Sequence, residues 1–118
     1  MHELGLLTSV LAAVEKAAAV ADYQVTRVKK VSLYVWAMSG AIPQALYGSW
    51  SIAKAQTICE SAELEINPIP ASVYCPKCQR EVEIDEFFAL LCPKCQTPTA
   101  NLTHGREFDI SWVEWDKE

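Results

Sequence analysis

The sequence predicts an α+β fold with α/β-like features: two helices pack on a small three-stranded sheet that carries an inserted zinc-ribbon module. Two segments repeat apolar residues at helical spacing, and three segments alternate apolar and polar residues as strands do. Two Cys-Pro-Lys-Cys motifs, thirteen residues apart, lie between the last two predicted strands. A chain of 118 residues suits one small domain with an appendage.

The first helix is predicted over residues 4–21, where alanine is frequent and proline is absent. Apolar side chains recur there every three or four residues: Leu4, Leu7, Leu11, Val14, Ala18 and Ala21. Its broad apolar face favours burial against a sheet, with a partner helix or subunit as the alternative. A second helix is predicted from Pro43 to about Ala55, with Leu46, Trp50 and Ala53 facing inward.

Strands are predicted over residues 25–35, 63–69 and from residue 108 onward. Val28 is out of phase with the alternation that follows it, which predicts a bulge near Lys29 and Lys30. Pro68 and Pro70 are expected to end the second strand. In the third strand, one face holds Phe108, Ile110 and Trp112, and the other holds Asp109, Ser111 and Val113. The order of the strands stays open.

These elements predict two domains, a main α/β domain of residues 1–72 and 101–118 and a zinc-binding domain of residues 73–100. Four apolar residues lie in or beside the segment between the two cysteine motifs: Phe87, Phe88, Leu90 and Leu91. They are expected to form the core of the small domain or to pack it against the main one. A loop with Gly40 at a positive φ is predicted before the second helix.

The paired motifs supply four thiols: Cys75, Cys78, Cys92 and Cys95. Two Cys-x-x-Cys turns that face each other form the ligand set of a structural Zn(II) site, whereas two disulfides or a redox pair are the alternatives. Four protein ligands leave no open position, so the zinc would stabilise the fold and not catalyse. Gln79 and Gln96 follow the two motifs at positions where glycine is frequent, at a cost of about 1–2 kcal/mol for a left-handed backbone.

Composition and charge exclude several classes of function. A net charge of −5 argues against non-specific binding to nucleic acid or to an anionic membrane. The N-terminus lacks the basic residues of a signal peptide, and Glu15 with Lys16 interrupts its apolar stretch. Together with five cysteines in a zinc-binding pattern, which fit a reducing compartment, this predicts a cytoplasmic protein. No paired carboxylates, nucleophile–base pair or phosphate-binding glycine loop is present, so we do not expect an enzyme.

The residues Met1-His2-Glu3 form a second candidate site. The α-amine, the backbone nitrogen of His2 and its imidazole can close adjacent chelate rings around one ion. Ni(II) or Cu(II) prefers such tetragonal nitrogen ligation, and Glu3 can add its backbone nitrogen or its carboxylate. A solvated terminal histidine without metal is the alternative.

Four stretches together resemble the HypA/HybF family of nickel-insertion proteins: Met1-His-Glu-Leu, Met38-Ser-Gly, the paired Cys-Pro-x-Cys motifs, and Gly105-Arg-Glu-Phe-Asp-Ile. The resemblance covers the whole chain. It implies a nickel metallochaperone for maturation of [NiFe]-hydrogenase, with transient Ni(II) at Met1, His2 and Glu3 and structural zinc on the four cysteines. It also implies the GTPase HypB and the hydrogenase large subunit as partners. Whether the chain is a monomer or a homodimer stays open.

An alternative function is a zinc-ribbon adaptor that binds nucleic acid or protein and carries no nickel. Basic residues near the cysteines are offset by acidic ones: Lys77, Arg80 and Lys94 against Glu81, Glu83, Asp85 and Glu86. No basic stripe results, which disfavours nucleic acid. Cys59 is expected to be a small buried side chain. His104 is expected to be a turn residue beside Gly105, with transient metal binding as the alternative.

Overall fold

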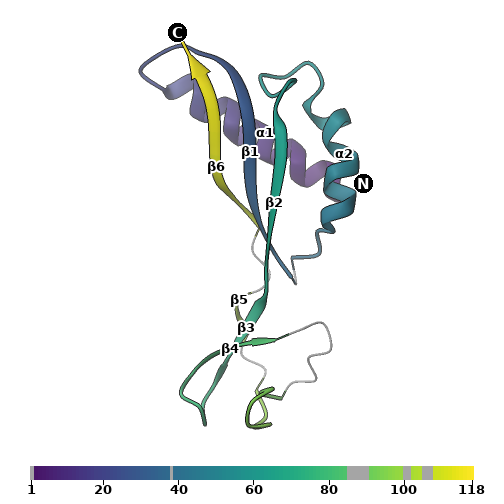
Figure 1. Cartoon of the computed structure of the whole chain (residues 1–118), viewed down its shortest axis with the longest axis vertical. Helices are drawn as coiled ribbons and strands as arrows, with labels where there is room; N and C mark the ends of the chain where they lie inside the picture. Colours follow the sequence, from purple (N-terminus) through teal and green to yellow (C-terminus); the bar gives the residue numbers. More distant parts are fainter. Residues whose placement is uncertain (1, 38, 85–90, 100–101, 105–107) are drawn as a thin grey trace.

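The computed structural model describes the chain except for residues 1, 38, 85–90, 100–101 and 105–107. The molecule is elongated, with extents of 55 × 30 × 16 Å. A unit of two helices and one sheet occupies one end, and a second sheet with the cysteine loops occupies the other (Figure 1). Neither helix is long and apolar enough, within the described residues, to cross a membrane.

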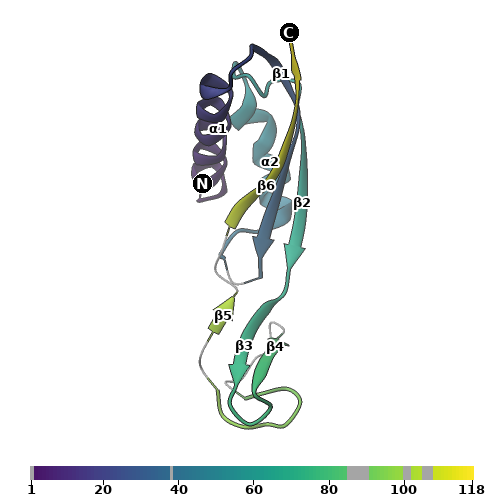
Figure 2. The same ribbon diagram turned by 90° about the vertical axis from the view of Figure 1, so that its left-hand side faces the viewer.

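The main sheet has the strand order β2-β1-β6. β1 (Val25–Trp36) lies in the centre, parallel to β2 (Glu63–Ile69) and antiparallel to β6 (Phe108–Lys117). α2 (Pro43–Lys54) forms the crossover that a parallel pair requires, and α1 (His2–Val20) precedes β1. Both helices lie on one face of the sheet (Figure 2). The predicted α+β fold is therefore confirmed.

The main core lies between the helices and the sheet. Both helices and the strands β1 and β2 contribute buried apolar side chains, whereas the apolar side chains of β6 in this core are half-buried. The fully buried side chains include Leu7, Val14, Val28, Val31, Leu33 and Leu46. Trp50 also points inward, and its indole N–H donates to the Ala62 carbonyl oxygen at 2.9 Å. Cys59 is fully buried in the same core, as the sequence predicts.

Three register shifts interrupt the pairing of β1 with β6, and the first falls between Val25 and Arg27. The second falls between Val28 and Lys30, which confirms the predicted bulge. The third falls opposite Ser111, because Leu33 pairs with Ile110 while Ser32 pairs with Trp112. This extra residue reverses the alternation, so Trp112 is 43% exposed while Val113 packs on the core. The predicted alternation of the third strand is wrong from this point onward.

Pro68 does not end the second strand as predicted, because β2 continues through it to Ile69. β2 is an edge strand, and an edge position tolerates the missing N–H of proline. Pro70 alone then separates β2 from β3 (Ala71–Cys75), which leads into the second sheet.

The second sheet has the order β4-β3-β5, with β4 (Arg80–Ile84) and β5 (Leu102–His104) both antiparallel to β3. It begins before residue 73 and ends after residue 100, and the division into two domains at those residues stays a prediction. Its core is small and consists of Ala71, Val73, Val82 and Ile84 with Cys75 and Cys92. Phe87, Phe88 and Leu90 lie outside the described residues, and Leu91 is exposed and not part of this core.

Candidate metal centres

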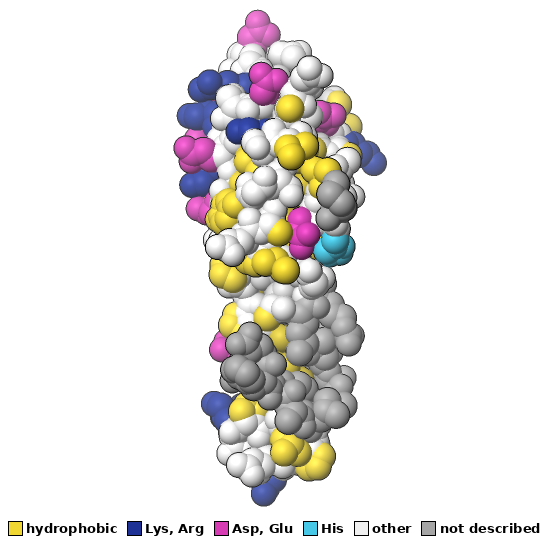
Figure 3. Space-filling model, turned by 90° about the vertical axis from the view of Figure 1, so that its right-hand side faces the viewer, with side chains coloured by type: hydrophobic (Ala, Val, Ile, Leu, Met, Phe, Trp, Pro, Cys, Tyr) yellow, Lys and Arg dark blue, Asp and Glu magenta, His cyan; other side chains and the backbone are white. Residues whose placement is uncertain are grey.

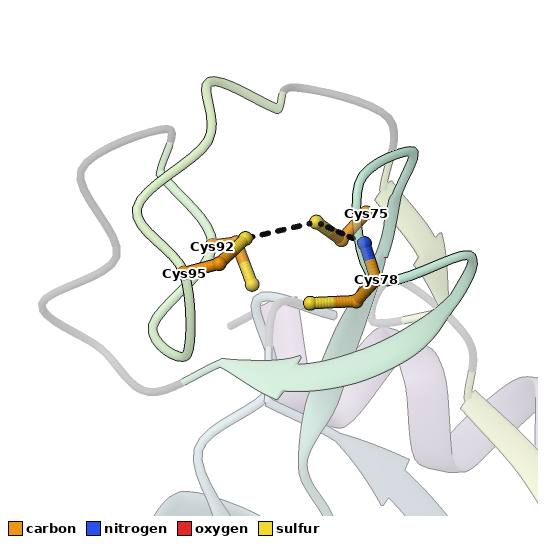
Figure 4. Close-up of side chains that lie close together, drawn as sticks. All are labelled: Cys75, Cys78, Cys92 and Cys95. Carbon is orange, nitrogen blue, oxygen red and sulfur yellow. Dashed lines mark hydrogen bonds between the residues drawn. The ribbon is translucent and has the colours of Figure 1, made fainter.

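The four cysteines of the paired motifs lie together at the far end of the second sheet (Figure 4). Their sulfur atoms all lie within 4.8 Å of one another, and the Sγ atoms of Cys75 and Cys95 are 3.4 Å apart. A tetrahedral zinc with Zn–S bonds of about 2.3 Å needs sulfurs about 3.8 Å apart. Cys75 and Cys92 are buried, whereas Cys78 and Cys95 are half-buried. The cluster therefore has the composition and spacing of a closed four-thiolate metal site.

Each motif folds into a turn of the same kind. The Gln79 N–H donates to the Cys75 carbonyl at 2.8 Å, and the Gln96 N–H donates to the Cys92 carbonyl at 2.7 Å. Both glutamines have the expected positive φ, 55° at Gln79 and 61° at Gln96. The Cys78 N–H also approaches the Cys75 sulfur at 3.4 Å, a contact that stabilises a thiolate. Cys75 lies at the end of β3. In the second motif, the Cys92 N–H donates to the Thr97 carbonyl at 2.9 Å, and this hydrogen bond stabilises the turn.

The thiols of the cluster differ in acidity. The Thr97 hydroxyl lies 3.2 Å from the Cys95 sulfur and, followed by the Thr97 backbone N–H, lowers the pKa of Cys95 to about 6. Hydrogen bonding with the thiols of Cys95 and Cys75 raises the pKa of Cys78 to about 12. A metal dication binds thiolates and releases their protons, so the hydrogen bonds between neighbouring thiols would be lost when a metal binds. Sequence reasoning missed the role of Thr97, because this residue lies outside both motifs.

The first residues of α1 dock on the loop between β1 and α2. A Cβ atom added at Gly40 would lie 3.7 Å from Nε2 of His2, so the imidazole rests against this glycine. Gly40 has φ +85°, as the sequence predicts, in a region that other residues rarely adopt. The Glu3 carboxylate accepts a hydrogen bond from the Ile42 N–H at 3.3 Å. Met1 lies outside the described residues.

The charge of Glu3 is favoured by its surroundings. Hydrogen bonding to its own backbone N–H, opposed by partial burial and reinforced by the Ile42 N–H, holds the pKa of its carboxyl below the usual value. The sequence placed Glu3 and Gly40 in separate motifs, and only the fold brings them together. Nothing in the sequence pattern of either motif predicts that the two segments contact each other.

Cys59 and His104 are the remaining candidates. Cys59 is buried in the main core, and burial, with Glu15 as a lesser cause, raises the pKa of its thiol to about 11. An inert structural thiol is expected from such surroundings. His104 is part of β5 and is not the turn residue that the sequence predicted. The cysteine cluster and the N-terminal contacts thus stand as the two candidate centres.

The α+β unit, whose first helix contacts the loop before α2, and the cluster of four cysteines define a class of small two-part proteins with a candidate metal site. Comparison with known proteins then shows the family: residues 1–115 match the HypA family model, described as hydrogenase/urease nickel incorporation, metallochaperone. The chain belongs to the HypA family. This confirms the resemblance that the sequence motifs carried, and it places the chain among maturation factors.

Individual relatives agree over nearly the whole chain. A hydrogenase maturation factor HypA of Chloroflexus aurantiacus is 35% identical over 114 residues, which cover 97% of this chain and 98% of the relative. Its counterpart in a Roseiflexus species is 33% identical over 118 residues, covering 100% of this chain and 94% of the relative. The solution structure of the Ni metallochaperone HypA from Helicobacter pylori superposes with a TM-score of 0.70 at 19% identity, covering 98% of both chains. That structure supports the fold.

Proposed function

We propose that this chain binds Ni(II) at Met1, His2 and Glu3 and delivers it for maturation of [NiFe]-hydrogenase. The observation that carries the proposal is the docking of His2 and Glu3 on the loop at Gly40 and Ile42, in a chain that matches a nickel-incorporation family over its length. Chain termini usually fray, so an anchored terminus calls for a reason. Nickel enters as cargo, held by the α-amine and the nitrogens of His2, which suit its tetragonal preference.

We further propose that Cys75, Cys78, Cys92 and Cys95 hold a structural Zn(II). The closed set of four sulfurs supports zinc because zinc favours tetrahedral thiolate ligation and has no redox chemistry. Such a site requires reduced thiols, which fits the cytoplasm. The cysteines and the N-terminal residues share no ligand, so the two metals can be tested separately.

The nickel proposal is tested by titration of zinc-loaded protein that carries its tag at the C-terminus, so that Met1 keeps a free amine. His2→Ala should abolish specific nickel binding, and one extra residue before Met1 should weaken it severely although every side chain remains. His104→Ala is the matched control, because it removes the other histidine of the chain and should leave binding unchanged. Zinc content should stay constant throughout. Full nickel affinity in the extended protein would reject a site that includes the α-amine.

The pH dependence gives a second test of the same site. Nickel must displace protons from the α-amine and from the imidazole, so affinity should fall steeply between about pH 8 and pH 6. A site made only of carboxylates would change little over this range, because carboxylates are already ionised there. A flat profile between these pH values would therefore contradict the proposal.

The proposed partners are the GTPase HypB and the hydrogenase large subunit. Apolar side chains on the face that carries α2 are exposed, including Ile42, Tyr47 and Ile52 (Figure 3). In α1, Leu4 is half-buried and remains outside the main core, whereas Leu7 is fully buried. We expect HypB to contact the start of α1, where an apolar surface adjoins the nickel ligands.

The partner proposal is tested by co-elution with HypB, with and without nucleotide. Leu4→Asp should prevent the complex while the helical circular dichroism stays unchanged. Val20→Asp is the matched control, since Val20 is 76% exposed at the other end of the same helix. Equal loss of binding in both variants would contradict an interface at the start of α1.

A further inference from the structure

The Glu3 carboxylate lies where the N-terminal ends of two helices meet. Glu3 belongs to the first turn of α1. Its Oε2 atom accepts the N–H of Ile42, the residue that caps α2. Ile42 offers no side-chain oxygen of its own as a cap. The N-terminal end of a helix carries a partial positive charge, so both helices favour an ionised carboxylate at this point.

His2 contacts the same loop beside Glu3, and the two contacts follow the same order along both segments. Its imidazole rests on Gly40, while Glu3 reaches Ile42 two residues further along the loop. The loop itself is fixed, because Ser39 donates its N–H to the Trp36 carbonyl at 3.0 Å and its hydroxyl oxygen accepts the Ala41 N–H at 3.2 Å. The start of α1 is therefore attached to a defined segment of backbone and not to mobile side chains.

We propose that the Glu3 side chain has a positioning role: its carboxylate fastens the start of α1 to the Ile42 N–H and thereby holds the His2 imidazole ready for nickel. The carboxylate does not ligate the metal, so the ligand that Glu3 offers to nickel is its backbone nitrogen. This proposal rests on the proposed nickel function. The Ile42 N–H already engages the carboxylate at 3.3 Å. If the carboxylate turned to the metal, the Ile42 N–H would lose its partner and the segment would lose its attachment. The site would then depend on the nitrogen donors of the terminus for its ligands.

The expected effect is moderate because the contact acts before the metal binds. Without it, binding nickel must also order the first residues, and an exposed hydrogen bond to a charged group contributes only modestly to that ordering. We therefore expect Glu3→Ala to weaken nickel binding about three- to tenfold. Loss of a metal ligand would be a larger effect and would change the spectrum of the bound ion.

The test compares Glu3→Gln with Glu3→Ala in zinc-loaded protein with a free N-terminus. The amide oxygen of glutamine can still accept the Ile42 N–H but is a poor nickel ligand. Glu3→Gln should keep nickel affinity near that of the wild type, and both variants should keep the visible and X-ray absorption spectra of the nickel complex. Glu15→Gln, on the same helix and far from its start, controls for the change of charge.

A metal-free measurement completes the test. Hydrogen exchange at the Ile42 amide should accelerate in Glu3→Ala and stay close to the wild type in Glu3→Gln. A changed nickel spectrum in Glu3→Gln, with an affinity as low as in Glu3→Ala, would show that the carboxylate is a ligand and overturn the proposal. Unchanged affinity and exchange in Glu3→Ala would also overturn it. If His2→Ala binds nickel like the wild type, the proposed function fails, whereas the Glu3 results alone reject only the positioning role.

Discussion

Loss of zinc should unfold the second sheet and leave the main unit folded. The perturbation is Cys92→Ser, which removes a buried sulfur from the cluster. The two cores share no residue, because one lies between the helices and the main sheet and the other surrounds the cysteines. Only Pro70 separates β2 from β3 along the chain, but their sheets are separate.

The magnitude follows from the size of the second core. Val73, Val82 and Ile84 are its large apolar members, and burying each contributes about 1.5–3 kcal/mol, or about 7 kcal/mol together. Fixing the backbone of the ten residues of β3 and β4 costs about 15 kcal/mol at 1–2 kcal/mol each. The proposed zinc would cover the shortfall of about 8 kcal/mol, because structural zinc binding is worth about 10–16 kcal/mol. Without zinc, this sheet should therefore not persist.

The assay reads the two units separately. Amide exchange at Val73 and Val82 reports the second sheet, and tryptophan fluorescence reports the main unit, which holds all four tryptophans. Trp36 borders the groove that Val82 lines, so it is replaced by Phe in every protein compared. In Cys92→Ser, zinc should be lost and exchange should become fast, while the midpoint of tryptophan-detected unfolding should not move.

Cys59→Ser is the matched control and should show the reverse pattern. Its sulfur is fully buried in the main core, so a hydroxyl there should cost about 1–3 kcal/mol of main-unit stability while zinc content stays the same. Retained zinc in Cys92→Ser would refute the four-thiolate site. A tryptophan-detected midpoint that falls together with the zinc content would refute the separation of the two units.

Three further outcomes are expected. Gly40→Ala should weaken nickel binding in a titration, because φ +85° is strained for alanine and the new methyl group would contact the His2 imidazole. Gly48→Ala is the control and should leave nickel binding unchanged, because the space around its Cβ is open. Gln79→Gly should retain zinc against more chelator, because it relieves a left-handed backbone. The Ser32 hydroxyl donates to Glu65 at 2.7 Å and lowers its pKa, so this stabilisation is present above about pH 4.5 and lost as pH falls further. Ser32→Ala should therefore reduce the free energy of unfolding at pH 7 more than at about pH 3.

Features with a local cause could be predicted from the sequence. Helix periodicity located α1 and α2, Pro43 marked the start of the second helix, and the paired motifs predicted the cysteine cluster. The positive φ at Gln79 also followed from local geometry, because the turn that brings two cysteines together needs a left-handed residue after it. Each of these features depends on a few neighbouring residues.

Features that depend on the partner strand could not be predicted. Pro68 continues in β2 because that strand lies at the edge of the sheet, and strand order was not readable from the sequence. The bulge at Ser111 arises from its pairing with β1 and turns Trp112 to the open face. Likewise, the contact of Glu3 with Ile42 joins residues 39 positions apart. Tertiary context decided all three.

The two candidate centres are held in place by different physical means. The second sheet buries few apolar side chains, so we expect its order to depend on the proposed zinc. The start of α1 needs no metal for its position: Leu7 and Val10 bury the helix in the main core, and Glu3 attaches its first turn to the loop. If nickel binds as proposed, a helix start that is fixed before the ion arrives would bind and release it without unfolding the main unit. That property suits a carrier, because cargo that also held the fold together would be costly to give up.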